Sequence, residues 1–358
     1  MKPDSSVQEL EATADRVPIA WSVAASTAQR LMRPGPVLPL AEAEATVARL
    51  RDFSVSAEAH VREVTGLGAG LPLYSGEVVD RPGWAQAAVV GLAALMDDAL
   101  AGDDPSTLLG GVAAGSAGVQ TGVVLAYLGS RVLGQYDPFG GEDGSGHLLL
   151  VAPNVVAARQ ALDVPAEDFE MWVCLHEATH RLQFNAVPWL RDHFASEVGS
   201  LLSSMDDTLA QVVVRLPELV RSARRRGAEG EPVGLMELLQ SPEQRVRLDR
   251  LIALSTLLEG HADHVMDAAG PSVVPSVRRI RARFTARRRG GGVLDRVLRS
   301  VLGVEAKVRQ YADGAQFTEQ VVDAVGMAGF NEVWRSPETL PSRAEISRPS
   351  DWLDRVHG

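Results

Sequence analysis

The run Trp172-Val-Cys-Leu-His176-Glu177-Ala-Thr-His180-Arg-Leu-Gln-Phe184 contains an uninterrupted HExxH motif. Upstream, Asp163 is a typical helix N-cap and Pro165 a typical first-turn residue, so we predict that the motif lies on a helix. Phe169, Trp172, Val173, His176 and His180 recur with helical periodicity, which turns both histidines inward. Residues four apart are neighbours on a helix, so both imidazoles can reach one cation. The spacing therefore predicts one zinc ion held by His176 and His180.

Glu177 is the residue that gives this motif a possible reaction. It lies about 100° around the helix from His176, where its carboxylate can meet a metal-bound water. Zinc lowers the pKa of bound water from about 16 to about 7, and a neighbouring carboxylate can take the proton during attack on a carbonyl. We therefore predict amide hydrolysis with Glu177 as general base. The alternative is a metal-free pair of buried histidines with a solvated glutamate between them.

The composition indicates a soluble globular protein. Hydrophobic residues make up 46% of the 358 residues and charged residues 23%, with a net charge of −11 that disfavours nucleic acid as a partner. Helical periodicity recurs along the chain whereas strand-like alternation is scarce, which predicts a mainly α (α+β) fold with a small sheet. The seven arginines of residues 278–289 are interpreted as a solvated helix face.

Two features bear on compartment and redox chemistry. Cys174 is the only cysteine, so no internal disulfide can form, and it lies two residues from His176, on a different helix face. We interpret it as a small buried packing residue. The N-terminus lacks an apolar segment behind a basic one, which is the pattern of a secretory signal, so a cytoplasmic location is expected.

The remaining segments are expected to be mostly scaffold. Helices are predicted near 18–33, 40–65 and 80–100, and the uncharged stretch 108–128 is interpreted as a buried helix in preference to a membrane span, because it is rich in glycine and lacks an aromatic belt. Residues 134–146 are predicted to form a turn-rich loop. His147 to Pro153 is the best strand candidate, and a peptide could be gripped there by strand addition.

The chain as a whole resembles a bacterial family of uncharacterised zincin-like metallopeptidases. The resemblance rests on the motif run together with Leu133-Gly-Gln-Tyr-Asp137, Leu150-Val-Ala-Pro-Asn154, Val187-Pro-Trp-Leu190, Leu258 to Asp267, Gln310-Tyr-Ala-Asp-Gly314 and Leu340-Pro-Ser342. It implies a zinc hydrolase with a zincin-like core of many packed helices, and an association of some members with deazaflavin-coenzyme biosynthesis. We expect a loose tail at 1–14 and one zincin-like unit over 15–358, with a helical part at 15–135, the metal-site core at 136–270 and a second helical part at 271–358.

The resemblance also suggests further site residues. The metzincin pattern needs a glycine at position 183 and a histidine at 186, but this chain has Gln183 and Ala186. In the gluzincin pattern a later helix supplies a glutamate ligand and, four residues on, an aspartate that orients a ligand histidine. Glu259 and Asp263 match that pattern, although His261 falls between them.

The third metal ligand can also be considered from the residues themselves. The candidates are Glu197, Glu259, His261 and His264. Glu259 follows Ser255 of an inward apolar stripe by one helical turn, so its carboxylate should face the core, where a cation compensates its burial. His261 lies roughly 200° around the helix from Glu259 and should point away. We therefore predict Glu259 as the ligand.

No residue is singled out as the stabiliser of a reaction intermediate. Tyr311, His193 and His264 could each donate a hydrogen bond to an oxyanion, and Tyr311 could equally be a half-buried packing residue. The two functions considered are a zinc peptidase acting on a peptide or amide substrate, and a zincin-shaped binding or scaffold protein that keeps the metal without turnover. The intact Glu177 favours the peptidase. Neither the substrate nor the oligomeric state can be predicted.

Overall fold

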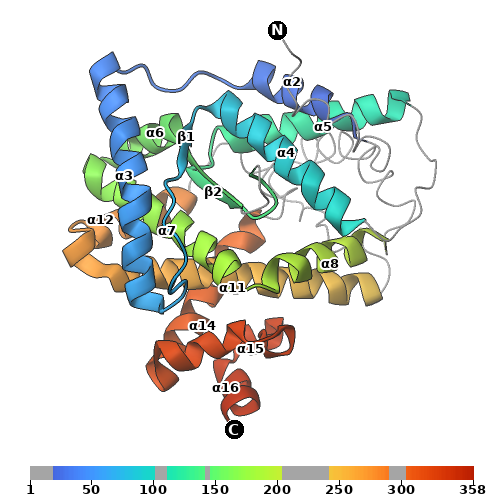
Figure 1. The fold of residues 1–358 in the computed structure, drawn as a ribbon, viewed down its shortest axis with the longest axis vertical. Helices are drawn as coiled ribbons and strands as arrows, with labels where there is room; N and C mark the ends of the chain where they lie inside the picture. Colours follow the sequence, from blue (N-terminus) through green and yellow to red (C-terminus); the bar gives the residue numbers. More distant parts are fainter. Residues whose placement is uncertain (1–18, 101–110, 142–145, 204–241, 290–303) are drawn as a thin grey trace. The chain divides into compact units, whose positions relative to one another are not determined.

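The computed structural model describes residues 19–100, 111–141, 146–203, 242–289 and 304–358, so the predicted tail at 1–14 lies outside the described residues. Helices dominate, with one three-stranded sheet, which confirms the expected fold class. The elements are α2 (Trp21–Leu31), α3 (Leu40–Thr65), β1 (Glu77–Val79), α4 (Arg81–Ala99), α5 (Gly111–Gly129), β2 (Gly134–Asp137), β3 (His147–Val151), α6 (Ala152–Leu162), α7 (Ala166–Ala186), α8 (Leu190–Ser203), α11 (Pro242–Val273), α12 (Val277–Arg289), α14 (Val304–Phe330), the 3₁₀ helices η2 (Asn331–Trp334) and η3 (Pro337–Thr339), α15 (Arg343–Ser347) and α16 (Pro349–His357) (Figure 1).

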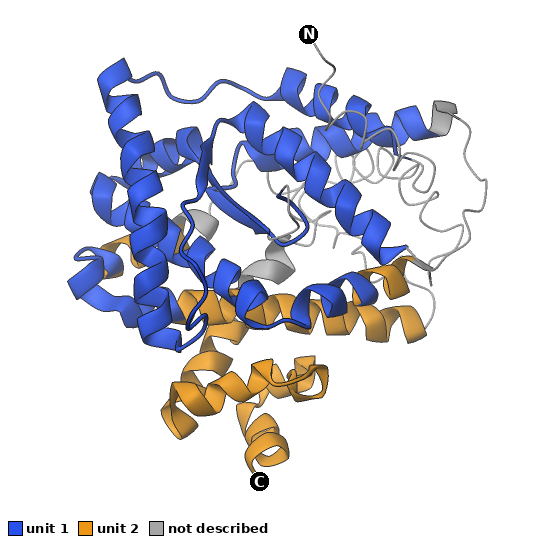
Figure 2. Ribbon diagram, viewed as in Figure 1, with its two compact units in different colours: residues 1–196, 265–277 blue, residues 197–264, 278–358 orange. Residues whose placement is uncertain are grey.

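The chain divides into two compact units (Figure 2). The first unit comprises residues 1–196 and 265–277, and the second comprises residues 197–264 and 278–358. The long helix α11 contributes residues to both. That residues 15–358 form one zincin-like unit stays a prediction.

The sheet of the first unit has the order β1-β3-β2, with β1 parallel and β2 antiparallel to β3. Leu148, Leu149, Leu150 and Val151 of β3 are all buried, as expected for a central strand covered on both faces. The predicted strand at 147–153 is confirmed over His147–Val151, after which Ala152 begins α6 with Pro153 in its first turn. The idea that a peptide adds to this strand is wrong, because β1 and β2 already occupy both of its edges.

Strand β2 lies where the sequence predicted only a loop. Its pairing with β3 runs from Gly134 opposite Leu150 to Asp137 opposite His147, so the segment is held by the sheet ladder and not by local turn signals. Its side chains alternate between the two faces of the sheet. Gln135 points towards α4, where its amide oxygen accepts a 2.9 Å hydrogen bond from the indole of Trp84. Gly134 and Tyr136 therefore face the other side, which α7 covers (Figure 1).

Helices α2, α4 and α5 build the core on the α4 side of the sheet. Trp21, Ala24, Trp84, Val89 and Leu125 are buried there together with two side chains of β3. The uncharged stretch that the sequence predicted as a core helix is α5. In the described ranges, no helix is both long enough and apolar enough to cross a membrane.

Helix α7 carries the HExxH motif and begins later than the sequence predicted. Asp163 was predicted as its N-cap, but Asp163 has a left-handed backbone with φ of 49° and ends α6 instead. Pro165 holds the N-cap position, and Glu167 and Asp168 place negative charge in the first turn, where it stabilises the helix dipole. The wrong assignment arose because Asp also suits a left-handed cap between two closely spaced helices.

Two ion pairs with buried carboxylates join α7 to α3. Glu170 has no exposed surface and accepts two hydrogen bonds from Arg49, from Nε at 2.7 Å and Nη2 at 2.9 Å. Eleven residues further along α7, Arg181 Nη1 lies 3.1 Å from Oε2 of the buried Glu58. Arg181 also donates to the carbonyl of Tyr74 at 2.6 Å. Because unpaired charges at these positions would be strongly destabilising, the pairs hold α7 against α3.

In the second unit, aromatic side chains form much of the core. Phe317, Phe330 and Trp352 are fully buried, and the indole of Trp352 donates a 2.8 Å hydrogen bond to the carbonyl of Thr339. The predicted arginine-rich helix is α12, in which Arg278 and Arg279 are exposed and directly precede the buried Ile280. That exposure agrees with a solvated face.

Candidate metal centre

The two histidines of the motif meet on one face of α7. Their Nε2 atoms are 3.1 Å apart, and the ring planes are nearly perpendicular at 87°. Two imidazole nitrogens bound to one tetrahedral zinc ion at about 2.05 Å are about 3.3 Å apart. The spacing of His176 and His180 therefore fits a shared zinc ion with little movement.

The second nitrogen of each imidazole also has a partner inside the protein. His180 Nδ1 lies 2.9 Å from Oε1 of Gln183, a fully buried side chain one turn along α7. An acceptor at Nδ1 fixes the tautomer that leaves Nε2 free for a metal. His176 Nδ1 lies 3.3 Å from Sδ of Met266, which is 1% exposed. Sequence reasoning missed the roles of Gln183 and Met266, although the i,i+3 spacing of Gln183 from His180 was a usable signal.

Glu177, the predicted base, points towards the sheet. Its side chain is 5% exposed and lies beside Gly134 of β2. A Cβ atom placed on Gly134 would lie 2.6 Å from Cγ and 2.9 Å from Oε1 of Glu177. The carboxylate of Glu177 thus occupies space that only a glycine at position 134 leaves open.

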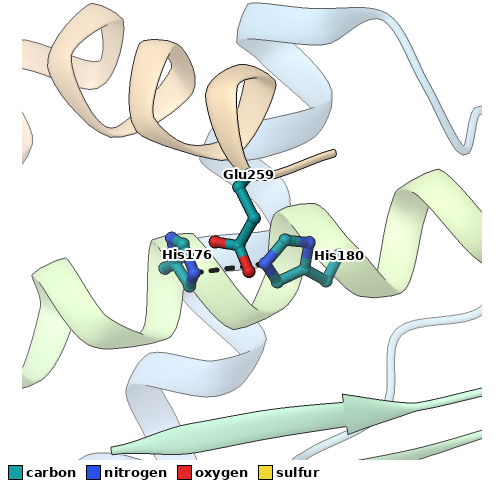
Figure 3. A group of neighbouring side chains, drawn as sticks. All are labelled: His176, His180 and Glu259. Carbon is teal, nitrogen blue, oxygen red and sulfur yellow. Dashed lines mark hydrogen bonds between the residues drawn. The ribbon is translucent and has the colours of Figure 1, made fainter. Parts of the chain in front are cut away.

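The regular helical backbone of α11 determines which way Glu259 points. The only non-helical backbone inside this helix is at Gly270, so residues 259–266 form continuous α-helix. Glu259 and Met266 are seven residues apart, which puts them on the same face with about 10 Å between them along the axis. Since Met266 contacts His176, that face of α11 is the one turned to the histidines. One ligand atom from each of His176, His180 and Glu259 lies within 4.8 Å of the others (Figure 3).

The packing of the second unit sets the rotation of α11 at Glu259. A Cβ on Gly260 would lie 2.1 Å from the carbonyl carbon of Gly314, so α11 and α14 cross in backbone contact at this position. His261 is fully buried and stacks on Phe330, with ring centroids 5.0 Å apart, and it contacts Trp334 at 5.6 Å with the rings tilted by 55°. His261 therefore points into the aromatic core, away from the face of Glu259, as helix geometry predicts.

The other predicted site residues have different surroundings. Asp263, expected to orient a ligand histidine, accepts a 2.8 Å hydrogen bond from Arg281, and its predicted role stays a prediction. Glu197, considered as a third ligand, lies 3.5 Å from Arg250. His193 packs edge-on against Trp189 at 5.6 Å.

His264 and Tyr311 are the other two candidate oxyanion donors. His264 is half-buried on α11. Tyr311 lies on α14, but its side chain is outside the described residues. The part of the chain that the structure describes therefore does not single out a stabiliser of a reaction intermediate.

Burial changes the ionisation of two β2 residues near the motif helix. It raises the pKa of Tyr136 to about 12, so the phenol stays protonated, and its hydroxyl donates a 2.7 Å hydrogen bond to Asn185. Burial also raises the pKa of Asp137. Its carboxylate accepts hydrogen bonds from the backbone N–H groups of Phe139 and Gly140, which lower that pKa but do not outweigh the burial. Next to α7, β2 therefore presents the neutral, hydrogen-bonding phenol of Tyr136.

Comparisons with known proteins agree with this geometry. The sequence profile of the zincin-like metallopeptidase family matches residues 19–353. A protein from Chloroflexus aurantiacus, whose crystal structure is provisionally described as a hydrolase with a novel fold, is similar at 30% identity with a TM-score of 0.64. The match covers 95% of this chain and 99% of that one. No curated protein sequence matches the chain. The expected association with deazaflavin-coenzyme biosynthesis and the cytoplasmic location stay predictions.

Proposed function

The chain belongs to the zincin-like metallopeptidase family, and we propose that it is a zinc-dependent hydrolase that cleaves peptide or other amide bonds. In this proposal His176, His180 and Glu259 hold one zinc ion and Glu177 is the general base. The observation that carries it is the donor set itself. Two imidazole nitrogens 3.1 Å apart and a carboxylate with all ligand atoms within 4.8 Å form the two-His, one-Glu set that catalytic zinc sites use.

When bound, zinc would polarise the carbonyl of the substrate and lower the pKa of a water so that it can react near neutral pH. The protein supplies the rest. His176 and His180 offer Nε2 because Gln183 and Met266 lie at their other nitrogens. Glu177, next in sequence to His176, receives the proton of the attacking water and can return it to the leaving amine. Its burial to 5% exposure keeps bulk water from competing for that proton.

The outer edge of β2 supports a peptide as the substrate. Val151 donates to the carbonyl of Leu133 at 2.9 Å, so the alternation of an antiparallel ladder turns the N–H and C=O of Gly134 and Tyr136 away from β3. Among the described residues, no strand pairs with that outer edge. An extended peptide can add there through its main chain. Gly134 also lies beside Glu177, so the added peptide passes close to the base.

The test combines metal analysis with cleavage of a peptide library by the wild-type protein and by Glu177→Gln. The substitution keeps the size of the side chain and removes the base, so we expect zinc to be retained and hydrolysis to be lost. Equal turnover by both proteins would refute the role of Glu177. Stoichiometric zinc with no cleavage by either protein would instead support a binding or scaffold function.

A second experiment addresses the third ligand. Zinc titration of Glu259→Ala should show a large loss of affinity, whereas Glu197→Ala should bind zinc like the wild type, because Glu197 pairs with Arg250. The opposite result, with full affinity in the first variant and loss in the second, would assign the ligand to Glu197.

A further inference from the structure

Gly134 and Glu177 are in unusually close contact. A Cβ atom on Gly134 would meet three atoms of Glu177: Cγ at 2.6 Å, Cδ at 2.8 Å and Oε1 at 2.9 Å. Non-bonded carbon atoms are most stable about 3.5–4.0 Å apart, so an alanine at this position cannot coexist with the present carboxylate position.

Space, and not backbone conformation, is the reason for this glycine. The glycines with left-handed backbone in the described ranges are Gly66, Gly68, Gly70, Gly141, Gly146, Gly270 and Gly326, and Gly134 is not among them. A glycine inside a strand weakens the strand, because it adds conformational entropy to the unfolded chain and packs no side chain. The chain nevertheless has glycine at the one β2 position that faces the carboxylate of Glu177.

The flexible partner in this contact is the glutamate side chain. Strand β2 is anchored on both faces, by the hydrogen bond from Trp84 to Gln135 and by the one from Tyr136 to Asn185. Helix α7 is held to α3 through Arg49 and Glu170. A methyl group at position 134 would therefore displace the end of the Glu177 side chain before it displaced either backbone.

We propose that Gly134 is a positioning residue: by lacking a side chain, it lets the Glu177 carboxylate take the place from which it acts as base. This inference rests on the proposed function for its catalytic consequence, although the contact itself does not. A displacement of about 1 Å at a reacting group can cost about 100-fold in rate. The proposal therefore predicts a catalytic defect in a protein that still folds and still binds zinc.

The first experiment is Gly134→Ala in the full chain, measured with a peptide that the wild type cleaves. We expect kcat to fall by about 10–100-fold, with KM and zinc affinity within about twofold of wild type, since neither metal binding nor substrate binding needs the base. The matched control is Gly115→Ala, because nothing lies within 4 Å of a Cβ there. A kcat of Gly134→Ala within twofold of wild type would overturn the proposal.

The second experiment is a double-mutant cycle on Tm, which needs no activity. Gly134→Ala should lower Tm in the wild-type background, but it should not lower Tm in the Glu177→Ala background, where the colliding atoms are gone. Equal shifts in both backgrounds would refute the contact. If Gly134→Ala alone does not fold, recovery of folding by the double variant supports the proposal, and failure of both refutes it.

The two experiments separate this inference from the proposed function. A wild-type protein that cleaves no peptide while the Tm cycle shows coupling would reject the hydrolase function and leave Gly134 as the residue that places the Glu177 side chain. Cleavage by the wild type together with additive Tm shifts would support the hydrolase function and reject the positioning role of Gly134.

Discussion

The hydrogen bond from His180 to Gln183 allows a quantitative prediction about zinc affinity. The Gln183 side chain is fully buried, so no water can replace it if its amide oxygen is lost. Gln183→Met keeps the length of the side chain and leaves the Nδ1–H of His180 without that acceptor. A buried donor that loses its partner costs about 1–3 kcal/mol, and loss of a group that orients a ligand histidine typically weakens metal binding about 10–100-fold. Since each tenfold is about 1.4 kcal/mol, the weaker zinc binding corresponds to about 1.4–2.8 kcal/mol, which lies within the range of about 1–3 kcal/mol for the lost acceptor.

The assay is competitive zinc titration against a chromophoric chelator at fixed pH, with circular dichroism to confirm folding. The matched control is Thr179→Val, which removes a buried hydroxyl from the same helix. Among the described residues, that hydroxyl bonds only the helix carbonyl of Leu175 at 2.8 Å, so its loss should affect stability without weakening zinc binding. If both variants bind zinc equally well, or if Gln183→Met binds as tightly as the wild type, Gln183 does not orient His180.

Three further predictions concern stability and reactivity. Arg49→Met should destabilise the protein by about 3–5 kcal/mol in chemical denaturation, because it leaves the fully buried Glu170 unpaired. Arg335→Met, at an exposed ion pair, should cost at most about 1 kcal/mol. Similar losses of stability in the two variants would contradict this prediction. Burial raises the pKa of Asp137 above its ordinary 3.8, so its charge destabilises the fold increasingly as pH rises through that raised value. Asp137→Asn should therefore flatten the dependence of Tm on pH above about 4, and an unchanged profile would count against it. Cys174 is fully buried with its pKa raised well above the ordinary value, so iodoacetamide should label it only after denaturation, and rapid labelling of the native protein would show that the thiol is accessible.

The parts of the site that were predictable from sequence are those that a single helix determines. His176 and His180 could be placed side by side because four residues make about one turn, and the structure puts their Nε2 atoms 3.1 Å apart. The orientation of His261 away from the face of Glu259 followed from the same geometry. Nothing beyond the local chain was needed for either inference.

Two of the three features that the sequence did not predict, strand β2 and the contact of Met266, depend on contacts distant in sequence. Strand β2 was predicted as a loop because Gly134 and its neighbours carry turn residues, and its strand identity comes from pairing with β3. The third, the contact of Gln183 with His180, is local, and the i,i+3 spacing of the two residues on one helix could have predicted it. Met266 could not be connected with His176 from sequence, since ninety residues separate them.

The ion pairs between α7 and α3 also restrict how the motif helix can move. Along α7 the charges run from Glu170 to Arg181, and along α3 from Arg49 to Glu58, so each helix presents the opposite sign at the matching end. Sliding α7 by one turn, about 5.4 Å, would break both pairs at once and leave the fully buried Glu170 without Arg49, whereas Glu58 would keep its pair with Arg62 on α3. A slide of α7 along α3 is therefore energetically unfavourable. The backbone amides around the two histidines should consequently exchange their hydrogens with solvent only when the whole unit unfolds, and among the slowest in the chain.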